Sequence, residues 1–278
     1  MSGFLAQVCA EARDRTARAH EVLPLGDLRD RARRCPRPPS FAAALGGPDV
    51  AVIAEVKRAS PARGHLAIIP DAGGLARAYA SGGAAAVSVL TEPAHFAGSL
   101  DDLVDVAAAT PLPALRKDFV INPYQVWEAR AAGAAAVLLI VAALEQDALA
   151  TLLRTTSEAE LNALVETHEE HEVTRAIGAF EAAGARGPLI IGINARDLTT
   201  LDVDPNRFAA LRGHVPDTAI AVAESGVREP ADVQRLAAAG ADAVLVGEAV
   251  GTATDPAAAV RALVTAGRHR VGAQEGAA

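Results

Sequence analysis

The chain contains only two lysines, Lys57 and Lys117, although lysine and arginine together number 26. Arginine stays protonated in proteins, whereas a lysine ammonium can give a proton to a reacting group. Each lysine stands at the end of a short strand-like segment, after IAEV and after ALR. We therefore predict that both amines take part in proton transfer. Two ammonium groups in one pocket would also lower each other's pKa.

Other polar side chains stand where further apolar segments end, namely Glu55, Glu166, Asn194, Arg196 and Glu224. Side chains alternate along a strand, so Glu55 shares a face with Lys57, and Asn194 shares a face with Arg196. A single Glu–Lys pair could be structural. So many charged groups meeting at one end of a sheet indicate a reaction site instead.

Eight short apolar segments predict strands buried on both faces. They are residues 50–56, 85–90, 114–116, 135–140, 163–165, 189–193, 219–223 and 243–246. Helical patterns follow them at residues 75–80, 100–108, 123–132, 146–154, 170–180, 205–211, 230–238 and 256–264. Eight strand–helix units predict an α/β fold with a single (β/α)8 TIM barrel, whose catalytic groups lie at the strand C-termini.

Gly226 and Gly247 follow the seventh and eighth strands of this barrel. Loops at these two places frequently bind phosphate through backbone N–H groups. The prediction is therefore a site for a small phosphorylated anion.

Two helical patterns, at residues 4–19 and 25–34, precede the first strand. A segment of this length cannot bury a core of its own. We expect residues 1–48 to form an N-terminal helical extension packed on the barrel, and residues 49–278 to form the barrel domain.

Composition limits the partners. The formal net charge of −8 argues against nucleic acid or an acidic membrane surface. Cys9 and Cys35 form no cluster with histidine, so we expect no metal site. We expect both thiols to be reduced and the protein to be cytoplasmic. No apolar run reaches the ~20 residues of a membrane span, and the N-terminus lacks a signal-peptide pattern.

Nine longer strings stand in order at or near the ends of the predicted strands. They are IAEVKRASP (53–61), VSVLTE (87–92), FAGSLDDL (96–103), LRKDFV (115–120), PYQ (123–125), ALVETH (163–168), GINARDL (192–198), AESGV (223–227) and ADAVLVGEA (241–249). Together with the site residues above, these strings resemble indole-3-glycerol-phosphate synthase, a barrel enzyme of tryptophan biosynthesis. The resemblance extends from about residue 50 to the C-terminus.

The resemblance implies a carboxy-lyase that acts on 1-(2-carboxyphenylamino)-1-deoxyribulose 5-phosphate. The aromatic ring attacks the ketone, then CO2 and water leave, and indole-3-glycerol phosphate forms. No organic cofactor is implied, because the cyclised iminium intermediate accepts the electrons itself.

The resemblance also assigns roles to residues of this chain. Lys117 looks like the general acid, Glu166 the base, and Lys57 an assisting cation held by Glu55, while Asn194 and Ser225 position substrate hydroxyls. The residues expected to bind the remainder of the substrate are Arg196 for the aryl carboxylate, Phe96, Phe119 and Leu138 for the ring, Ser60, Gly226, Gly247 and Glu248 for the phosphate, and Glu224 and Leu245 within the pocket.

Two positions depart from common family patterns, with Ala195 in place of Asn and Arg63 in place of Lys. Neither removes a residue assigned to the chemistry. Two other functions stay open at this point: another phosphate-binding barrel such as a phosphoribosyl isomerase, and a non-catalytic barrel subunit. We expect a monomer or a weak homodimer.

Overall fold

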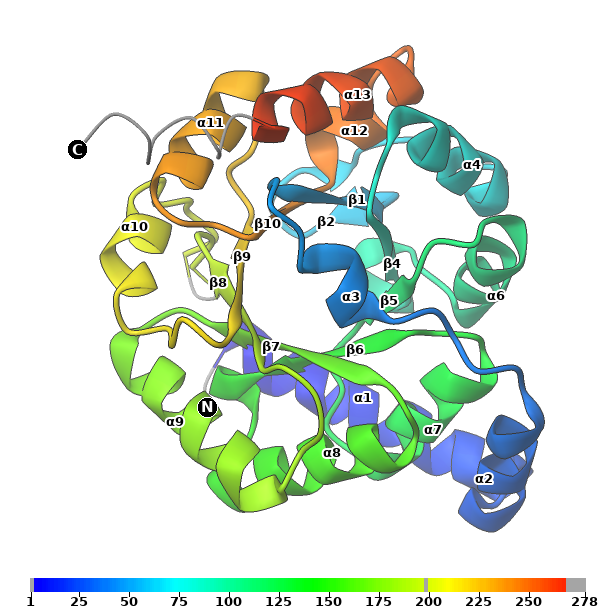
Figure 1. Ribbon diagram of the computed structural model, residues 1–278. Coiled ribbons are helices and arrows are strands. Elements are labelled where there is room, and N and C mark those ends of the chain that lie inside the picture. Colours follow the sequence, from blue (N-terminus) through cyan, green and yellow to red (C-terminus); the bar gives the residue numbers. More distant parts are fainter. Residues whose placement is uncertain (1–2, 198–199, 269–278) are drawn as a thin grey trace.

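The structure is a computed structural model that describes residues 3–197 and 200–268. Within these residues, eight parallel strands close into a barrel surrounded by helices (Figure 1). The barrel strands are β1 (Ala51–Val56), β4 (Ala86–Leu90), β5 (Ala114–Lys117), β6 (Ala136–Ile140), β7 (Asn162–Thr167), β8 (Ile190–Asn194), β9 (Ile220–Glu224) and β10 (Ala243–Val246).

The barrel predicted from the sequence is confirmed, and each predicted strand overlaps an observed one. Strand β6 shows why, because its sequence AVLLI is buried at every position. A strand covered by helices outside and by other strands inside has no face left for polar residues. The barrel closes where β1 pairs with β4 on one side and with β10 on the other.

Eight helices of the described residues follow the barrel strands and form the outer ring. They are α4 (Ala72–Gly82), α6 (Leu100–Ala109), α7 (Pro123–Ala131), α8 (Gln146–Glu158), α9 (Glu170–Ala183), α10 (Arg207–Arg212), α11 (Pro230–Ala238) and α13 (Pro256–Gly267). Their starts are marked in the sequence: Asp71 and Ser99 accept backbone N–H groups as N-caps of α4 and α6.

Several short elements lie in the loops and were not predicted. The loop after β1 folds into a hairpin of β2 (Ala59–Ser60) and β3 (Gly64–His65), paired antiparallel. The others are α5 (Pro93–Phe96), the 3₁₀ helix η1 (Val141–Ala143) and α12 (Glu248–Gly251). These elements are too short to leave a periodic pattern in the sequence.

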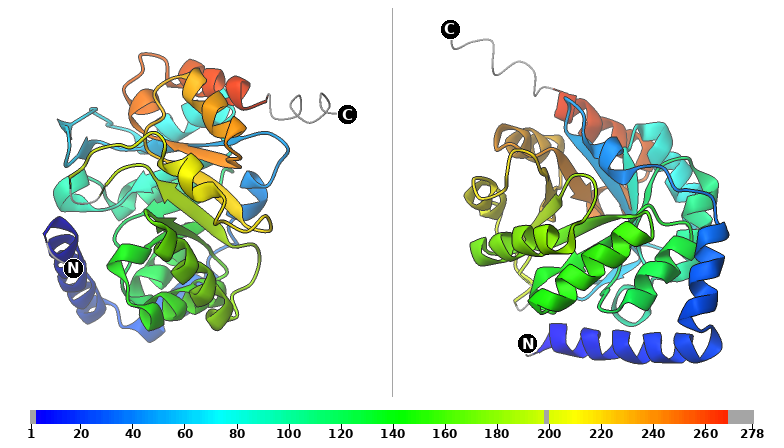
Figure 2. Two further views of the ribbon diagram at one scale, coloured as in Figure 1. Left: turned by 90° about the vertical axis from the view of Figure 1, so that its left-hand side faces the viewer. Right: turned by 60° about the horizontal axis from the view of Figure 1, so that its bottom comes forward.

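Three helices precede the barrel: α1 (Phe4–Val22), α2 (Leu25–Arg34) and α3 (Phe41–Leu45). Helix α1 lies across one end of the barrel and α3 lies at the opposite end (Figure 2). In α3, Phe41 and Leu45 are fully buried, and the Ala42 N–H donates to Asn162 Oδ1 at the start of β7. Helix α3 therefore covers the N-terminal ends of the strands, and α1 lies at the end where the strands finish.

Among the described residues, none of the helices combines the length and the apolar character that crossing a membrane requires.

Candidate active site

A cavity of about 1030 Å³, counting its open mouth, lies at the C-terminal ends of the barrel strands. The sequence-predicted site residues that line it are Glu55, Lys57, Ser60, Phe96, Lys117, Phe119, Leu138, Glu166, Asn194, Arg196, Glu224, Ser225, Leu245, Gly247 and Glu248. Gly226 is the exception and does not line the cavity. The structure thus brings together residues from all over the barrel at one rim.

Lys117 is the centre of the charged floor of this cavity. Its Nζ lies 3.1 Å from Glu166 Oε2, to which it donates a hydrogen bond, and 3.2 Å from Glu224 Oε2. The three residues come from β5, β7 and β9, which are not neighbours in the barrel. Their contact depends on side chains pointing inward from different strands across the barrel.

The protonation state of Lys117 differs from the sequence-based expectation. Burial alone would lower its pKa, but Glu166, Glu224 and Glu55 outweigh burial and raise the pKa above the ordinary lysine value. The expectation that two nearby ammonium groups lower each other's pKa is therefore wrong for Lys117. The carboxylates around it keep it charged, which is the state a proton donor needs.

Glu166 and Glu224 share Lys117 but end in opposite protonation states. For Glu166, the attraction of Lys117 and His168 outweighs burial and lowers the pKa. For Glu224, burial dominates, Lys117 compensates only in part, and repulsion from Glu166 adds to the raised pKa. Two carboxylates this close cannot both ionise easily, so Glu166 carries the charge and Glu224 keeps a proton.

Lys57 occupies the other side of the rim with a simpler set of partners. Its Nζ lies 3.0 Å from Glu55 Oε1, and Ser88 Oγ donates to Glu55 Oε2 at 3.0 Å. Lys57 and Lys117 both lower the pKa of Glu55 despite its burial. A Cβ on Gly247 would stand 2.7 Å from Glu55 Oε1 and 2.9 Å from Lys57 Nζ, so glycine leaves the room that this pair occupies.

The apolar end of the cavity is aromatic. The rings of Phe96 and Phe119 lie 6.4 Å apart between centroids, and Leu138 also lines the wall. Phe4 of α1 adds a third ring, edge-on to Phe119 at 6.3 Å. Sequence reasoning missed Phe4, because nothing in its segment says which end of the barrel α1 covers.

The loops after β8 and β9 shape the polar wall. The Arg196 N–H donates to Asn194 Oδ1 at 3.0 Å, and Arg196 Nη1 donates to the carbonyl of Leu201 at 2.8 Å. Ser225 and Gly226 have φ angles of 66° and 82°. This left-handed backbone turns the chain sharply at the rim and places Ser225, but not Gly226, against the cavity.

The hairpin after β1 reaches across to the end of β10, where Arg63 forms an ion pair with Glu248. Both side chains are largely exposed, at 58% and 41%. The pair therefore links the β2–β3 hairpin to α12 above the cavity and contributes little stability of its own.

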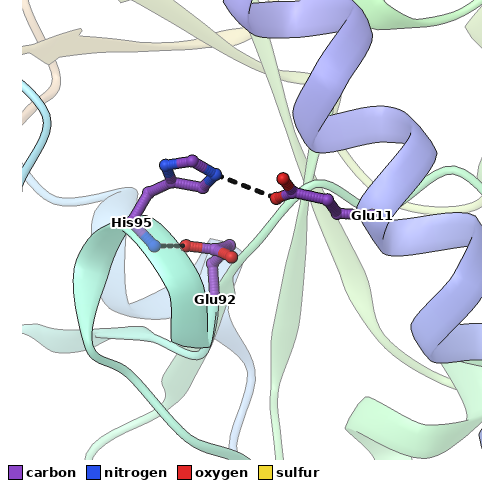
Figure 3. Close-up of side chains that lie close together, drawn as sticks. All are labelled: Glu11, Glu92 and His95. Carbon is purple, nitrogen blue, oxygen red and sulfur yellow. Dashed lines mark hydrogen bonds and ion pairs between the residues drawn. The ribbon is translucent and has the colours of Figure 1, made fainter.

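Helix α1 is fastened to the rim by polar contacts that the sequence did not reveal. Arg15 donates to Asp118 at 2.7 Å and to Glu92 at 3.3 Å, while Glu11 lies 2.9 Å from His95 Nε2 (Figure 3). Asp118 is buried and also accepts hydrogen bonds from Thr91 and Arg116. The Asp in the LRKDF string thus anchors the N-terminal helix next to Lys117.

Glu11, Glu92 and His95 are the one group of metal-ligand residue types that converge within the described part of the chain. The carboxylate of Glu92 already accepts three backbone N–H groups at the start of α5 and a hydrogen bond from Arg15. Its oxygens are therefore engaged in holding α5 and α1, and the group is a structural contact between these helices.

The comparisons with known proteins agree with the motifs and the geometry. The family model "Indole-3-glycerol phosphate synthase" matches residues 5–263. The chain belongs to the indole-3-glycerol phosphate synthase family.

Curated relatives support this membership along most of the chain. Indole-3-glycerol phosphate synthase of Mycolicibacterium gilvum is 54% identical over 248 residues, which cover 89% of each chain. The protein of the same name from Mycobacteroides abscessus is also 54% identical over the same coverage.

Solved structures show the same barrel at low sequence identity. Thiamine phosphate pyrophosphorylase from Pyrococcus furiosus has a TM-score of 0.58 at 17% identity and covers 81% of this chain and 98% of its own. 3-Hexulose-6-phosphate synthase from Salmonella typhimurium has a TM-score of 0.60 at 16% identity, covering 80% and 100%. These likenesses support the fold alone.

Membership of the indole-3-glycerol phosphate synthase family decides between the functions that the sequence left open. It removes the phosphoribosyl isomerase alternative. The non-catalytic alternative predicts the loss of a charged residue from the rim, yet Lys57, Lys117 and Glu166 are all present and line the cavity.

Proposed function

We propose that this chain converts 1-(2-carboxyphenylamino)-1-deoxyribulose 5-phosphate to indole-3-glycerol phosphate, CO2 and water, as a carboxy-lyase of tryptophan biosynthesis. The observation that carries the mechanism is the Lys117–Glu166–Glu224 cluster at the cavity floor. It offers a charged acid and an ionised base side by side, which ring closure and dehydration require in turn.

Ring closure needs an acid. The ring carbon that bears the carboxylate bonds to the ketone carbon, and the ketone oxygen gains negative charge. Lys117 is held charged by its carboxylate neighbours and donates a proton to that oxygen, which becomes a hydroxyl. Loss of CO2 then returns the C–CO2 bonding electrons to the cationic ring system.

Dehydration needs a base and an acid. Glu166 is ionised and accepts the proton that must leave the intermediate, while the hydroxyl departs as water after protonation. Lys57 faces the same cavity from β1 and assists this departure as a cation or second acid, with Glu55 holding its ammonium at 3.0 Å.

The remaining residues bind and orient the substrate. Asn194 and Ser225 position its hydroxyls, and Arg196 pairs with the aryl carboxylate, from the polar wall that they line. The aromatic ring packs on Phe96, Phe119 and Leu138. The phosphate binds near the ends of β1 and β10, through backbone N–H groups at Ser60, Gly247 and Glu248, and Leu245 and Glu224 also line this pocket. Gly226 lies outside the lining and contributes by turning the chain next to Ser225.

The direct test is the appearance of indole fluorescence when the purified chain is mixed with the anilino-ribulose phosphate. CO2 release should match indole formation. Lys117→Met should abolish most of the signal, whereas Arg77→Met, which alters a side chain that is 59% exposed beside Asp71, should leave it unchanged. Absence of an indole product from the wild-type chain would overturn the proposed function.

We also propose that residues 1–48 serve as an extension of a barrel domain that comprises residues 49–278. The net charge of −8 supports a protein without a nucleic-acid partner. A monomer or weak homodimer is supported by the exposed large apolar side chains of the described residues, Val22, Ile68 and Val104, which lie on separate segments. Free thiols at Cys9 and Cys35 support a cytoplasmic location.

A further inference from the structure

His168 is a buried ionisable residue that the proposed mechanism does not use. It follows the end of β7, two residues after Glu166, and its side chain is 10% exposed. Its Nε2 lies 3.5 Å from Glu166 Oε1, and its Nδ1 lies 3.4 Å from Glu172 Oε2 in the first turn of α9. Each ring nitrogen therefore faces a different carboxylate.

Glu172 fixes the imidazole in this place. Its Oε2 also accepts the backbone N–H of His168 at 2.6 Å, which joins the end of β7 to the start of α9. The carboxyl group is nearly buried, with 8% of the side chain exposed. Such an anion beside the ring favours imidazolium, and the contacts of Glu172 and Glu166 raise the pKa of His168 although burial alone would lower it.

The described carboxylates that face His168 come from three elements: Glu166 on β7, Glu172 on α9 and Glu224 on β9. Lys117 reaches Glu166 from β5 and contacts Glu224 as well. Glu166 and Glu224 thus share one ammonium. Of these two carboxylates, the structure gives an ion-pair contact with His168 for Glu166 and none for Glu224.

We propose that His168 is a positioning residue that makes Glu166, rather than Glu224, the ionised base, by setting a second cation against Glu166 Oε1. Lys117 holds the other oxygen of Glu166, so the carboxylate is oriented from both sides. The contact of 3.5 Å is longer than a good N–H···O hydrogen bond, and the effect is therefore one of charge. This inference rests on the proposed role of Glu166.

The decisive variant is His168→Gln, which is neutral and keeps an amide donor of similar reach. A reaction that requires ionised Glu166 loses rate as pH falls. Without the imidazolium, this acidic limb of the kcat profile should move to higher pH by about one unit, the lower end of the effect of a nearby opposite charge. KM for the anilino-ribulose phosphate should change much less than kcat.

The matched control is His171→Asn on α9, the helix that carries Glu172. His171 pairs with Glu169 at 3.2 Å, and its side chain is 64% exposed, away from Glu166. The acidic limb should coincide with that of the wild type. Glu172→Gln is the second variant, which leaves His168 in place but weakens its charge. It should shift the limb in the same direction and by less.

A double variant tests whether Glu224 is the carboxylate that competes with Glu166. If His168 discriminates between two carboxylates, Glu224→Gln removes the competitor, and His168→Gln should shift the limb less in that background. An unmoved acidic limb in both His168→Gln and Glu172→Gln, with kcat reduced and folding intact by circular dichroism, would overturn the proposal. Such a result leaves the proposed reaction standing as long as the wild type forms the indole.

Discussion

Lys57 and Lys117 are the same amino acid at one rim, yet their surroundings differ. Lys57 faces a single carboxylate at 3.0 Å and is 20% exposed, whereas Lys117 contacts two at 3.1 and 3.2 Å and is 14% exposed. An ammonium between two buried carboxylates is held in place and held charged. One with a single partner near the mouth keeps more freedom to follow the substrate. The comparison assigns the fixed acid to Lys117 and the assisting role to Lys57.

The largest expected effect on the rate comes from replacing Lys117. Lys117→Met removes the acid for ring closure and should lower kcat by about 10²–10⁴-fold, the usual contribution of general acid catalysis. Lys57→Met should cost less in kcat. Steady-state indole formation compares the two variants, and an equal or larger loss at Lys57 would reverse the assignment of the two amines.

The next effect separates the two steps of the reaction. Glu166→Gln keeps the size of the side chain but cannot accept a proton, so dehydration should become slow while ring closure continues. We expect a rate loss of roughly 10²-fold at the dehydration step. Single-turnover measurements should show CO2 release ahead of indole formation. Equal slowing of both signals would instead place Glu166 in ring closure.

Two glycines provide a milder test, because Gly192 leaves space for Glu224 and Gly247 leaves space for the Glu55–Lys57 pair. A Cβ on Gly192 would collide with the carboxylate of Glu224, and a Cβ on Gly247 would press on Glu55 and Lys57. A small displacement of catalytic groups can cost up to about 10²-fold in rate. Gly192→Ala should approach this loss, since Glu224 is buried, and Gly247→Ala should lose about tenfold in kcat/KM.

Gly213→Ala is the control for both glycine variants. Gly213 has a helical φ of −65°, and no atom lies within 4 Å of the place that a Cβ would take, so alanine should be accepted without loss of rate. If Gly192→Ala retains full activity, the close fit of Glu224 against β8 is not needed for the reaction.

The sequence predicted the barrel and most of the rim because both depend on simple patterns. Continuous apolar segments mark strands buried on both faces, and parallel strands in a barrel bring their C-terminal residues to one end. Lys57 and Glu166 could therefore be placed together without knowing any distance. The family resemblance then supplied roles for residues such as Leu138, which pattern alone would treat as core.

Sequence reasoning missed contacts between residues that are far apart in the chain. The environment of Lys117 depends on Glu166 and Glu224, which are distant in sequence and lie on non-adjacent strands. Phe4 lines the cavity from α1, and Arg15 of the same helix contacts Asp118 and Glu92. A helical pattern does not tell which barrel end the helix covers. His168 shares the inward alternation of Glu166, but its contact with Glu172 depends on the turn into α9.

The smallest expected effect concerns stability, and it contrasts Glu224 with Glu166. The folded chain raises the pKa of Glu224 above the ordinary value of about 4.3, mainly through burial. Between that value and the raised pKa, the folded state holds a proton that the unfolded state has released. Stability therefore falls as pH rises through this window, and it is level below and above it. Glutamine has no such proton, so the Tm of Glu224→Gln minus the Tm of the wild type should increase as pH rises through this window.

Glu166 should show the opposite sign, because Lys117 and His168 outweigh burial and lower its pKa. Its contribution to stability is present above the ordinary value and is lost as pH falls towards the lowered pKa. The Tm of Glu166→Gln minus the Tm of the wild type should therefore decrease as pH rises to about 4.3, and the difference should stay constant above that pH. Thermal unfolding of both variants across the pH range measures the two trends. Curves with the same trend would mean that the two carboxylates are not held in opposite protonation states, and the division between base and proton-bearing partner would fail.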